Sequence, residues 1–135
     1  MENLIKVLIV DDNKYLADLM GYALAMHEDI YITGICNSGA AALDALQNAQ
    51  ADVMLLDIIM PDMDGLQVLA HMNDHVLNKP AVILLTAIGN DDILQTAAEL
   101  GADSFLLKPV NADVIVQRIR TVYESRRQGL IKADV

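Results

Sequence analysis

Five residues with ligating or reactive side chains come at the ends of apolar runs in the sequence. Asp11 and Asp12 follow the run LIKVLIV, and Asp57 follows VMLL. Thr86 closes AVILLT, and Lys108 follows SFLL. In an open parallel sheet the carboxyl ends of the strands meet at one edge, where ligands bind. We therefore expect these three carboxylates, the hydroxyl and the ammonium to lie together.

Three carboxylates close together repel one another unless a cation keeps them ionised. Oxygen ligands without histidine or cysteine favour a hard divalent cation, which predicts a Mg²⁺ site at Asp11, Asp12 and Asp57, with Mn²⁺ or Ca²⁺ as alternative ions. Considered alone, Asp11 and Asp12 could instead cap the first helix. The polar residues that end the other apolar runs favour the metal site.

Asp57 is the carboxylate that ends a strand and leads into a loop, so we expect room in front of it for an incoming group. A carboxylate can attack phosphorus and form an aspartyl phosphate. A metal ion and Lys108 would neutralise the transferred oxygens, and Thr86 could turn its hydroxyl toward them. The sequence thus predicts Asp57 as a nucleophile. For Thr86 the alternative is a core role, with its hydroxyl bonded to the backbone.

The elements that must position these residues alternate along the chain. Five apolar runs have the length and β-branched content of strands buried on both faces. They span 4–10, 30–36, 53–57, 81–86 and 104–107. The segments between them carry apolar residues at helical spacing, the first of which are Leu16, Leu19, Met20, Ala23 and Leu24. This alternation predicts an α/β domain whose parallel sheet is covered by helices on both faces.

Several residues mark where the helices begin and end. Ser38 and Asn111 are candidate N-caps, and Gly101 is a candidate stop after a helical stripe. After Asp57, Pro61 and Gly65 are typical of a turn before a helix that begins near Asp64. We expect Asp62 and Asp64 to be helix-start charges rather than metal ligands.

Length, composition and charge limit the class of protein. With 135 residues and 54% apolar content, the chain can form one domain with a real core. Its net charge of −10 argues against direct binding of nucleic acid, which depends on Lys and Arg meeting phosphates. The first apolar run is too short for a membrane span, and the single cysteine, Cys36, cannot form a disulfide within the chain. We expect a cytoplasmic protein that does not associate with membranes.

All four arginines, Arg118, Arg120, Arg126 and Arg127, lie in the last segment. They predict either a solvated face of a last helix or a surface for a partner or self-association. Residues 1–127 are expected to form the domain, and residues 128–135 a tail or linker stub.

The segments VLIVDDN, LLDIIMPDMDGL, LLTA and FLLKP stand in the order and spacing of receiver domains of two-component response regulators. The chain resembles this family over residues 4 to about 126. The resemblance implies a flavodoxin-like domain with strand order 2-1-3-4-5 that accepts a phosphoryl group from a phosphohistidine of a histidine kinase or phosphotransferase. It also implies that Asp12, Asp57 and the backbone carbonyl of Ile59 bind Mg²⁺ directly, and that Asp11 binds it through water.

By the same resemblance Thr86 and Lys108 contact the phosphoryl group, and Phe105 is the aromatic residue that turns inward when Thr86 moves. Phe105 lacks the hydroxyl of the tyrosine that many members have, and Val110 stands where phenylalanine is usual. The face built by strands 81–86 and 104–107 and the last helix is expected to switch and so to control an output domain or a partner. The last helix on this face is also a candidate homodimer surface.

Within the family, the segments DIIMPDMDGL and LLTAIGNDD are most similar to receivers that control sporulation in endospore-forming bacteria, where a DNA-binding domain follows. We therefore expect a role in sporulation and transcription regulation, as a single-domain relay or as the receiver of a longer regulator. In either case the chain would be a signalling module rather than an enzyme.

Two other classes remain open. One is a Mg²⁺-dependent phosphatase or phosphotransferase that uses an aspartyl nucleophile; Ile59 argues against it, because an acid/base aspartate is expected at that position. The other is a flavin or nucleotide carrier on the same fold, which the repulsion between acidic residues and a phosphate disfavours.

Overall fold

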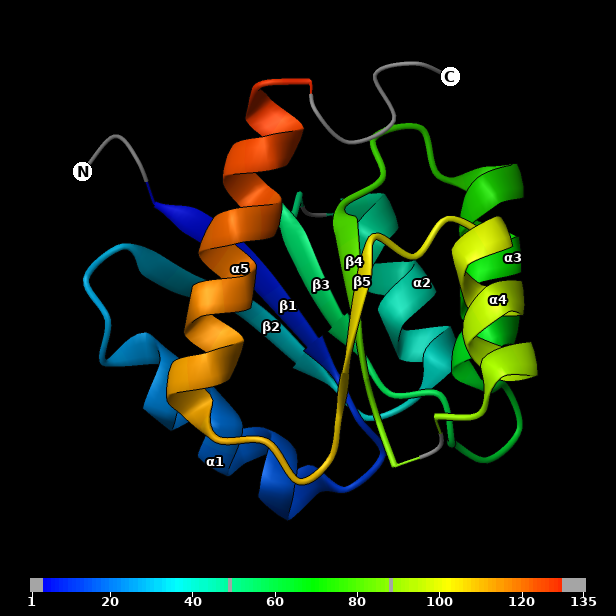
Figure 1. The fold of residues 1–135 in the computed structure, drawn as a ribbon, viewed down its shortest axis with the longest axis horizontal. Coiled ribbons are helices and arrows are strands. Elements are labelled where there is room, and N and C mark those ends of the chain that lie inside the picture. Colours follow the sequence, from blue (N-terminus) through cyan, green and yellow to red (C-terminus); the bar gives the residue numbers. More distant parts are fainter. Residues whose placement is uncertain (1–3, 49, 88, 130–135) are drawn as a thin grey trace.

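Strands and helices alternate five times in the computed structural model of the protein, which describes residues 4–48, 50–87 and 89–129 (Figure 1). The strands are β1 (Ile5–Val10), β2 (Ile30–Cys36), β3 (Val53–Leu56), β4 (Ala81–Thr86) and β5 (Ser104–Leu107). The helices are α1 (Lys14–Ala25), α2 (Gly39–Asn48), α3 (Gly65–His75), α4 (Asp91–Glu99) and α5 (Ala112–Arg127). Each of the five predicted strands is present, with ends that differ by at most one residue.

The strands form one parallel sheet in the order β2-β1-β3-β4-β5. This confirms the predicted α/β, flavodoxin-like class and its strand order. The register pairs Val10 with Leu56, and Thr86 with Leu107, so the carboxyl ends of the strands meet at one edge. The side chains that follow those ends are therefore brought to the same place.

The sheet separates two apolar layers. Helices α1 and α5 pack on one face, and α2, α3 and α4 pack on the other (Figure 1). Every residue of β3 and β4 is buried, because a strand in the middle of such a sheet is covered on both sides. The uninterrupted apolar runs of the sequence follow from this double coverage.

The buried face of α1 agrees only in part with the one that the apolar spacing predicts: Leu24 is buried and Met20 packs against the core, as expected. Leu16 and Leu19 are 47% and 46% exposed, whereas the buried residues of α1 are Ala17, Gly21 and Leu24. Small residues face the sheet because the helix lies very close to it: a Cβ on Gly21 would lie 2.9 Å from Cδ1 of Ile35. Close approach to the sheet, rather than side-chain hydrophobicity alone, sets the orientation of this helix.

The predicted helix ends are confirmed. Ser38 Oγ accepts a hydrogen bond from the Ala41 amide, and the Asn111 side chain caps α5. Gly101 follows α4 with a φ of 107°, which only glycine adopts easily. Asp64 caps α3 in a reciprocal capping box with Gln67, as expected for a helix-start charge.

Helix α5 ends at Arg127, the last residue of the predicted domain. Most of that tail, residues 130–135, lies outside the described residues. The division into a domain and a tail stays a prediction. Among the described residues, no helix has both the length and the apolar character needed to cross a membrane.

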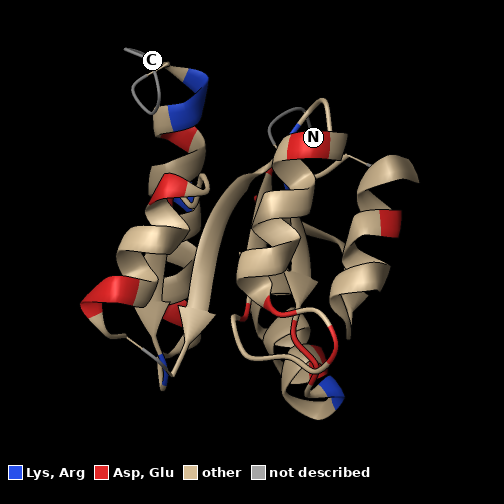
Figure 2. Ribbon diagram, turned by 90° about the vertical axis from the view of Figure 1, so that its right-hand side faces the viewer, with Lys and Arg blue, Asp and Glu red and all other residues tan. Residues whose placement is uncertain are grey.

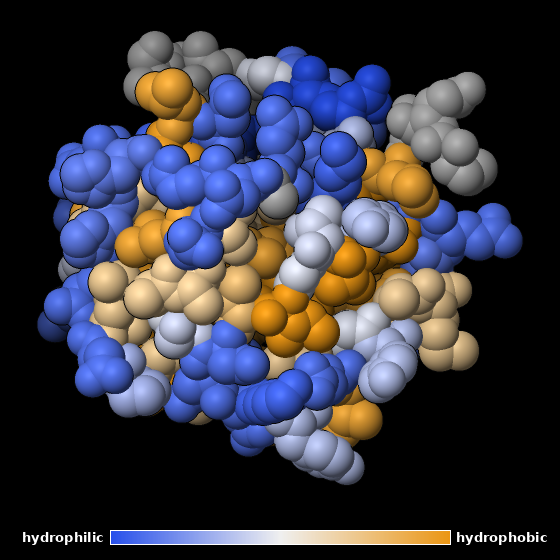
Figure 3. Space-filling model, turned by 180° about the vertical axis from the view of Figure 1, so that it is seen from behind, coloured by the Kyte–Doolittle hydropathy of each residue, from blue (hydrophilic) through white to orange (hydrophobic). Residues whose placement is uncertain are grey.

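The surface is apolar in places despite the net negative charge. Seen from behind, a band of apolar residues crosses the middle of the molecule between hydrophilic regions (Figure 3). The edge strand β2 is only partly covered, and its Tyr31 is 55% exposed. Tyr22 and Met26 of α1 are also largely exposed.

Gly65 has a structural reason that goes beyond the predicted turn. Its amide donates to the Ile58 carbonyl at 2.8 Å, and a Cβ at this position would lie 2.5 Å from the Asp57 carbonyl oxygen. Because that neighbour is backbone, it cannot move aside without moving the loop. Gly65 thus lets α3 begin directly against the backbone of Asp57.

We expect Gly65→Ala to lower the free energy of unfolding by about 1–3 kcal/mol, as overpacking against a fixed neighbour does. Gly34→Ala is a matched control, since its Cβ would meet only the flexible end of Leu8, at 3.2 Å. Urea denaturation of both variants checks this. Equal losses in the two variants would show that the close approach at Asp57 is not what requires glycine.

Candidate functional site

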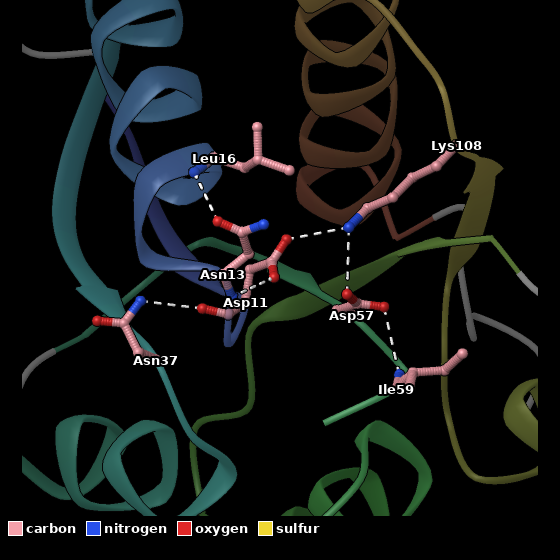
Figure 4. A network of polar contacts seen from close by, with 7 residues as sticks. All are labelled: Asp11, Asn13, Leu16, Asn37, Asp57, Ile59 and Lys108. Atoms are coloured by element: carbon pink, nitrogen blue, oxygen red, sulfur yellow. Dashed lines mark hydrogen bonds and ion pairs between the residues drawn. The ribbon is translucent and has the colours of Figure 1, made fainter. Parts of the chain in front are cut away.

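Three of the predicted site residues meet at the carboxyl edge of the sheet. The Lys108 ammonium lies 3.0 Å from Asp11 Oδ2 and 3.1 Å from Asp57 Oδ2, and so joins the ends of β1, β3 and β5 (Figure 4). Asp11 and Asp57 are only 5% and 9% exposed. One partly exposed cation is therefore shared between two buried carboxylates.

Asp11 is held in place from both its backbone and its side chain. Its amide donates to the Cys36 carbonyl at 3.0 Å, and its carbonyl accepts from Asn37 Nδ2 at 2.9 Å. Its other carboxylate oxygen, Oδ1, accepts from the Asn13 amide at 2.9 Å. With these contacts fixed, Oδ2 is directed at Lys108 (Figure 4).

Asp57, at the end of β3, is likewise held through both its backbone and its side chain. Its amide continues the sheet by donating to the Val10 carbonyl at 3.0 Å. Oδ1 accepts from the Ile59 amide at 3.3 Å, and Oδ2 accepts from Lys108. The carboxylate that interrupts the apolar run is thus fixed at the point where β3 has just ended.

Asp12 completes a group of three carboxylates. One oxygen from each of Asp11, Asp12 and Asp57 lies within 4.8 Å of the other two. Asp12 is exposed and faces solvent from the rim of the buried pair. The side chain that caps α1 belongs to Asn13, so neither aspartate is needed for that role. Oxygen donors of this number and spacing suit a hard divalent cation.

The charges in the site change the acidity of its members. Burial raises the pKa of Asp57, and the neighbouring Lys108 offsets this only in part. Burial alone would lower the pKa of Lys108, but its hydrogen bond to Asp11 and the charge of Asp57 outweigh it and raise that pKa. The lysine therefore stays charged, while Asp57 resists ionisation more than an exposed carboxyl does.

The remaining predicted site residues lie around this centre. Thr86 ends β4 between the strands that lead to Asp57 and Lys108; it is 0% exposed, and its carbonyl accepts from the Lys108 amide at 2.8 Å. The peptide bond from Lys108 to Pro109 is cis. Phe105 is 44% exposed, and the Ile59 side chain is 50% exposed. The predicted roles of Thr86, Phe105 and the Ile59 carbonyl stay predictions.

Two asparagines that support the site were missed from the sequence. Asn13 caps α1 and bonds Asp11 through its amide, and Asn37 holds the Asp11 carbonyl. Asn37 directly follows β2, so the rule that polar residues after strands gather at one edge would have identified it. Asn13 is also found by the ordinary preference for Asn at helix starts.

Positive charge gathers at one end of the molecule, whereas negative charge is spread over it. In Figure 2, Lys and Arg cluster at the upper end of α5, with a few more at the lower edge, while Asp and Glu mark both the helices and the lower loops. Each arginine of α5 has a partner within the chain. Arg118 bonds Ser104 and Phe105, Arg120 bonds Asp29, Arg126 bonds Lys79 and Asp103, and Arg127 bonds Glu124. The homodimer face proposed for this helix stays a prediction.

The sequence matches a known family over most of its length. The family model described as the response regulator receiver domain matches residues 7–120. The signal receiver domain of the response regulator NarL from Mycobacterium tuberculosis is 31% identical, with a TM-score of 0.84, and the match covers 90% of this chain and 98% of that one.

Two further solved structures are similar. A DNA-binding response regulator of the LuxR family from Staphylococcus aureus is 28% identical, with a TM-score of 0.81, over 89% of this chain and 99% of that one. A CheY-like response regulator receiver domain protein from Methanospirillum hungatei is 23% identical, with a TM-score of 0.82, over 93% of this chain and 98% of that one. At this last identity the likeness shows the fold alone.

We expect Asp57→Asn to stabilise the protein by on the order of 1 kcal/mol at pH 7 without divalent ions, since it removes a buried charge and leaves Lys108 paired with Asp11. Because the folded pKa of Asp57 is raised, wild-type stability falls as pH rises from the unfolded value near 3.8 through the folded pKa. The advantage of the variant should therefore disappear below that window.

Urea denaturation of both proteins across this pH range, with and without Mg²⁺, measures the effect. Mg²⁺ should stabilise the wild type more than Asp57→Asn, because the variant loses an anionic ligand. A variant less stable than the wild type at pH 7 without metal would contradict the expected cost of the buried carboxylate.

Proposed function

Because this chain belongs to the response regulator receiver domain family, we propose that it accepts a phosphoryl group on Asp57, with Mg²⁺, from a phosphohistidine. The donor would be a histidine kinase or a histidine phosphotransferase. The observation that carries the proposal is the Lys108 ammonium, which lies between the buried carboxylates of Asp11 and Asp57 at the edge of a receiver fold. The chain would act as a signalling domain in a phosphorelay.

The transfer is a displacement at phosphorus. A carboxylate oxygen of Asp57 forms a bond to phosphorus while the bond from phosphorus to the imidazole nitrogen breaks. The bonding pair returns to that nitrogen, and an imidazole protonated on its other nitrogen leaves as a neutral ring. The product is an aspartyl phosphate, and no other reactant is consumed.

The residues present fit the metal that the family implies. Asp12 and Asp57 would bind it directly, with Asp11 through water and the carbonyl of Ile59 as a further ligand. When bound, Mg²⁺ supplies positive charge to the oxygens of the transferred group. Asp57 presents its oxygen at the end of β3, and Lys108, released from one carboxylate, can pair with the phosphoryl oxygens.

The signal would leave the site through β4 and β5. Thr86 would contact the phosphoryl group, and Phe105 would move with it, since both lie on neighbouring strands that join the site to α4 and α5. Phosphorylation adds about −1.5 to −2 charge and three acceptor oxygens at this point. The face of β5 and α5 would then act on an output domain, a partner or a second copy of the chain, in the cytoplasm.

We expect one phosphoryl group per chain after incubation with acetyl phosphate and Mg²⁺, measured by intact mass. Asp57→Ala and a metal-free control should gain none, because each removes a required part of the site. An unmodified wild-type protein that is folded would contradict the proposal. Continuous release of phosphate from an unrelated phosphomonoester would favour a phosphatase instead.

We also propose that the chain serves a sporulation phosphorelay and, through it, transcription regulation. The support is the sequence similarity of DIIMPDMDGL and LLTAIGNDD to receivers of that kind. We expect faster labelling of Asp57 by a phosphorylated phosphotransferase from a sporulation phosphorelay than by one from a chemotaxis pathway, measured by transfer of ³²P. Equal or reversed rates would count against this assignment.

A further inference from the structure

We propose that Arg118 is a positioning residue for the phosphotransfer: it fixes β5 from the outside of the sheet and so holds Lys108 in its place between the carboxylates. This inference rests on the proposed function for its effect on rate. The structural part of the inference, that Arg118 fixes β5, does not depend on the proposed phosphotransfer.

Strand β5 is held only weakly by the sheet and the core. It has four residues, lies at the sheet edge and bonds only to β4. Of its side chains only Leu106 is buried, while Phe105 and Leu107 are 44% and 50% exposed. Apolar burial, which fixes β3 and β4 from both faces, therefore contributes little to holding β5.

Arg118 supplies contacts that burial does not. Its Nη1 donates to the Ser104 hydroxyl and, at 3.1 Å, to the Phe105 carbonyl. Two consecutive residues at the start of β5 are thus bonded to one guanidinium on α5. Helix α5 is itself packed into the core through buried Ile115 and Ile119, so the anchor is firm.

The consequence for the site follows from the shortness of the strand. Lys108 comes directly after β5, about 13 Å along the extended chain from Ser104. Its amide bonds the Thr86 carbonyl at 2.8 Å, and its ammonium makes both carboxylate contacts. A strand that slides or frays at its first residues moves the lysine, and a misplacement of about 1 Å can cost ~100-fold in rate.

The same helix offers a matched control. Arg120 lies two residues after Arg118 and makes a bidentate pair with Asp29. Its Nε is 2.8 Å from Asp29 Oδ2, and its Nη2 is 3.0 Å from Oδ1. Asp29 directly precedes β2, at the opposite edge of the sheet from β5. Removing Arg120 thus takes away a comparable arginine and a comparable set of bonds without touching β5.

The test compares Arg118→Ala, Arg118→Lys and Arg120→Ala with the wild type. Three quantities are measured: the rate of labelling by acetyl phosphate at saturating Mg²⁺, the Kd for Mg²⁺, and hydrogen exchange of the Leu106 to Lys108 amides. We expect Arg118→Ala to lower the rate about 10-fold and to speed exchange in β5, with the Kd changed less than about 2-fold. Arg118→Lys, which keeps the charge but lacks the planar guanidinium and its fixed donor geometry, should fall between.

Arg120→Ala should leave the rate and the exchange of β5 at wild-type values. Equal rates for Arg118→Ala and Arg120→Ala would overturn the inference. So would a slower rate accompanied by unchanged exchange in β5, which would mean that Arg118 acts elsewhere. If the wild type takes no phosphoryl group, the proposed function fails, and hydrogen exchange alone then decides whether Arg118 fixes β5.

Discussion

Mutual repulsion between carboxylates at one edge of the sheet is the constraint on which the structure depends. Two of them are buried, and each would be costly there without a positive partner. Lys108 serves as the internal counter-ion, bonded to both Asp11 and Asp57. Asp11 follows β1, Asp57 follows β3 and Lys108 follows β5. The site is therefore complete only when these three strands are in register.

The rest of the fold fixes those three strand ends. In the middle of the sheet, β3 and the neighbouring β4 are packed on both faces and fully buried. Gly65 lets α3 begin against the Asp57 backbone, and Asn37 reaches across from the end of β2 to the Asp11 carbonyl. At the outer edge burial is weak, and polar contacts from α5 take its place. Core packing thus positions the central strands, and hydrogen bonds to side chains position the strand at the edge.

Much of this was predictable from the sequence, because apolar runs that end in polar residues reveal both the strands and the site. Every predicted strand was found, and Asp11, Asp12, Asp57 and Lys108 meet as expected. The buried face of α1 was predicted only in part, since Ala17 and Gly21 also face the sheet, where the helix approaches it closely. The partners of the arginines also escaped prediction, because a contact such as that of Arg118 with β5 depends on tertiary structure.

The pair between Arg120 and Asp29 joins residues 91 positions apart, one in the last helix and one ahead of the second strand. The residues before β2 therefore complete their contacts only when a helix far along the chain is present. During synthesis β1, α1 and β2 would leave the ribosome before α5, which carries the arginine that pairs with Asp29. The contacts of the first two strands should therefore be complete only after α5 has been synthesised, so that the docking of α5 is part of forming the core.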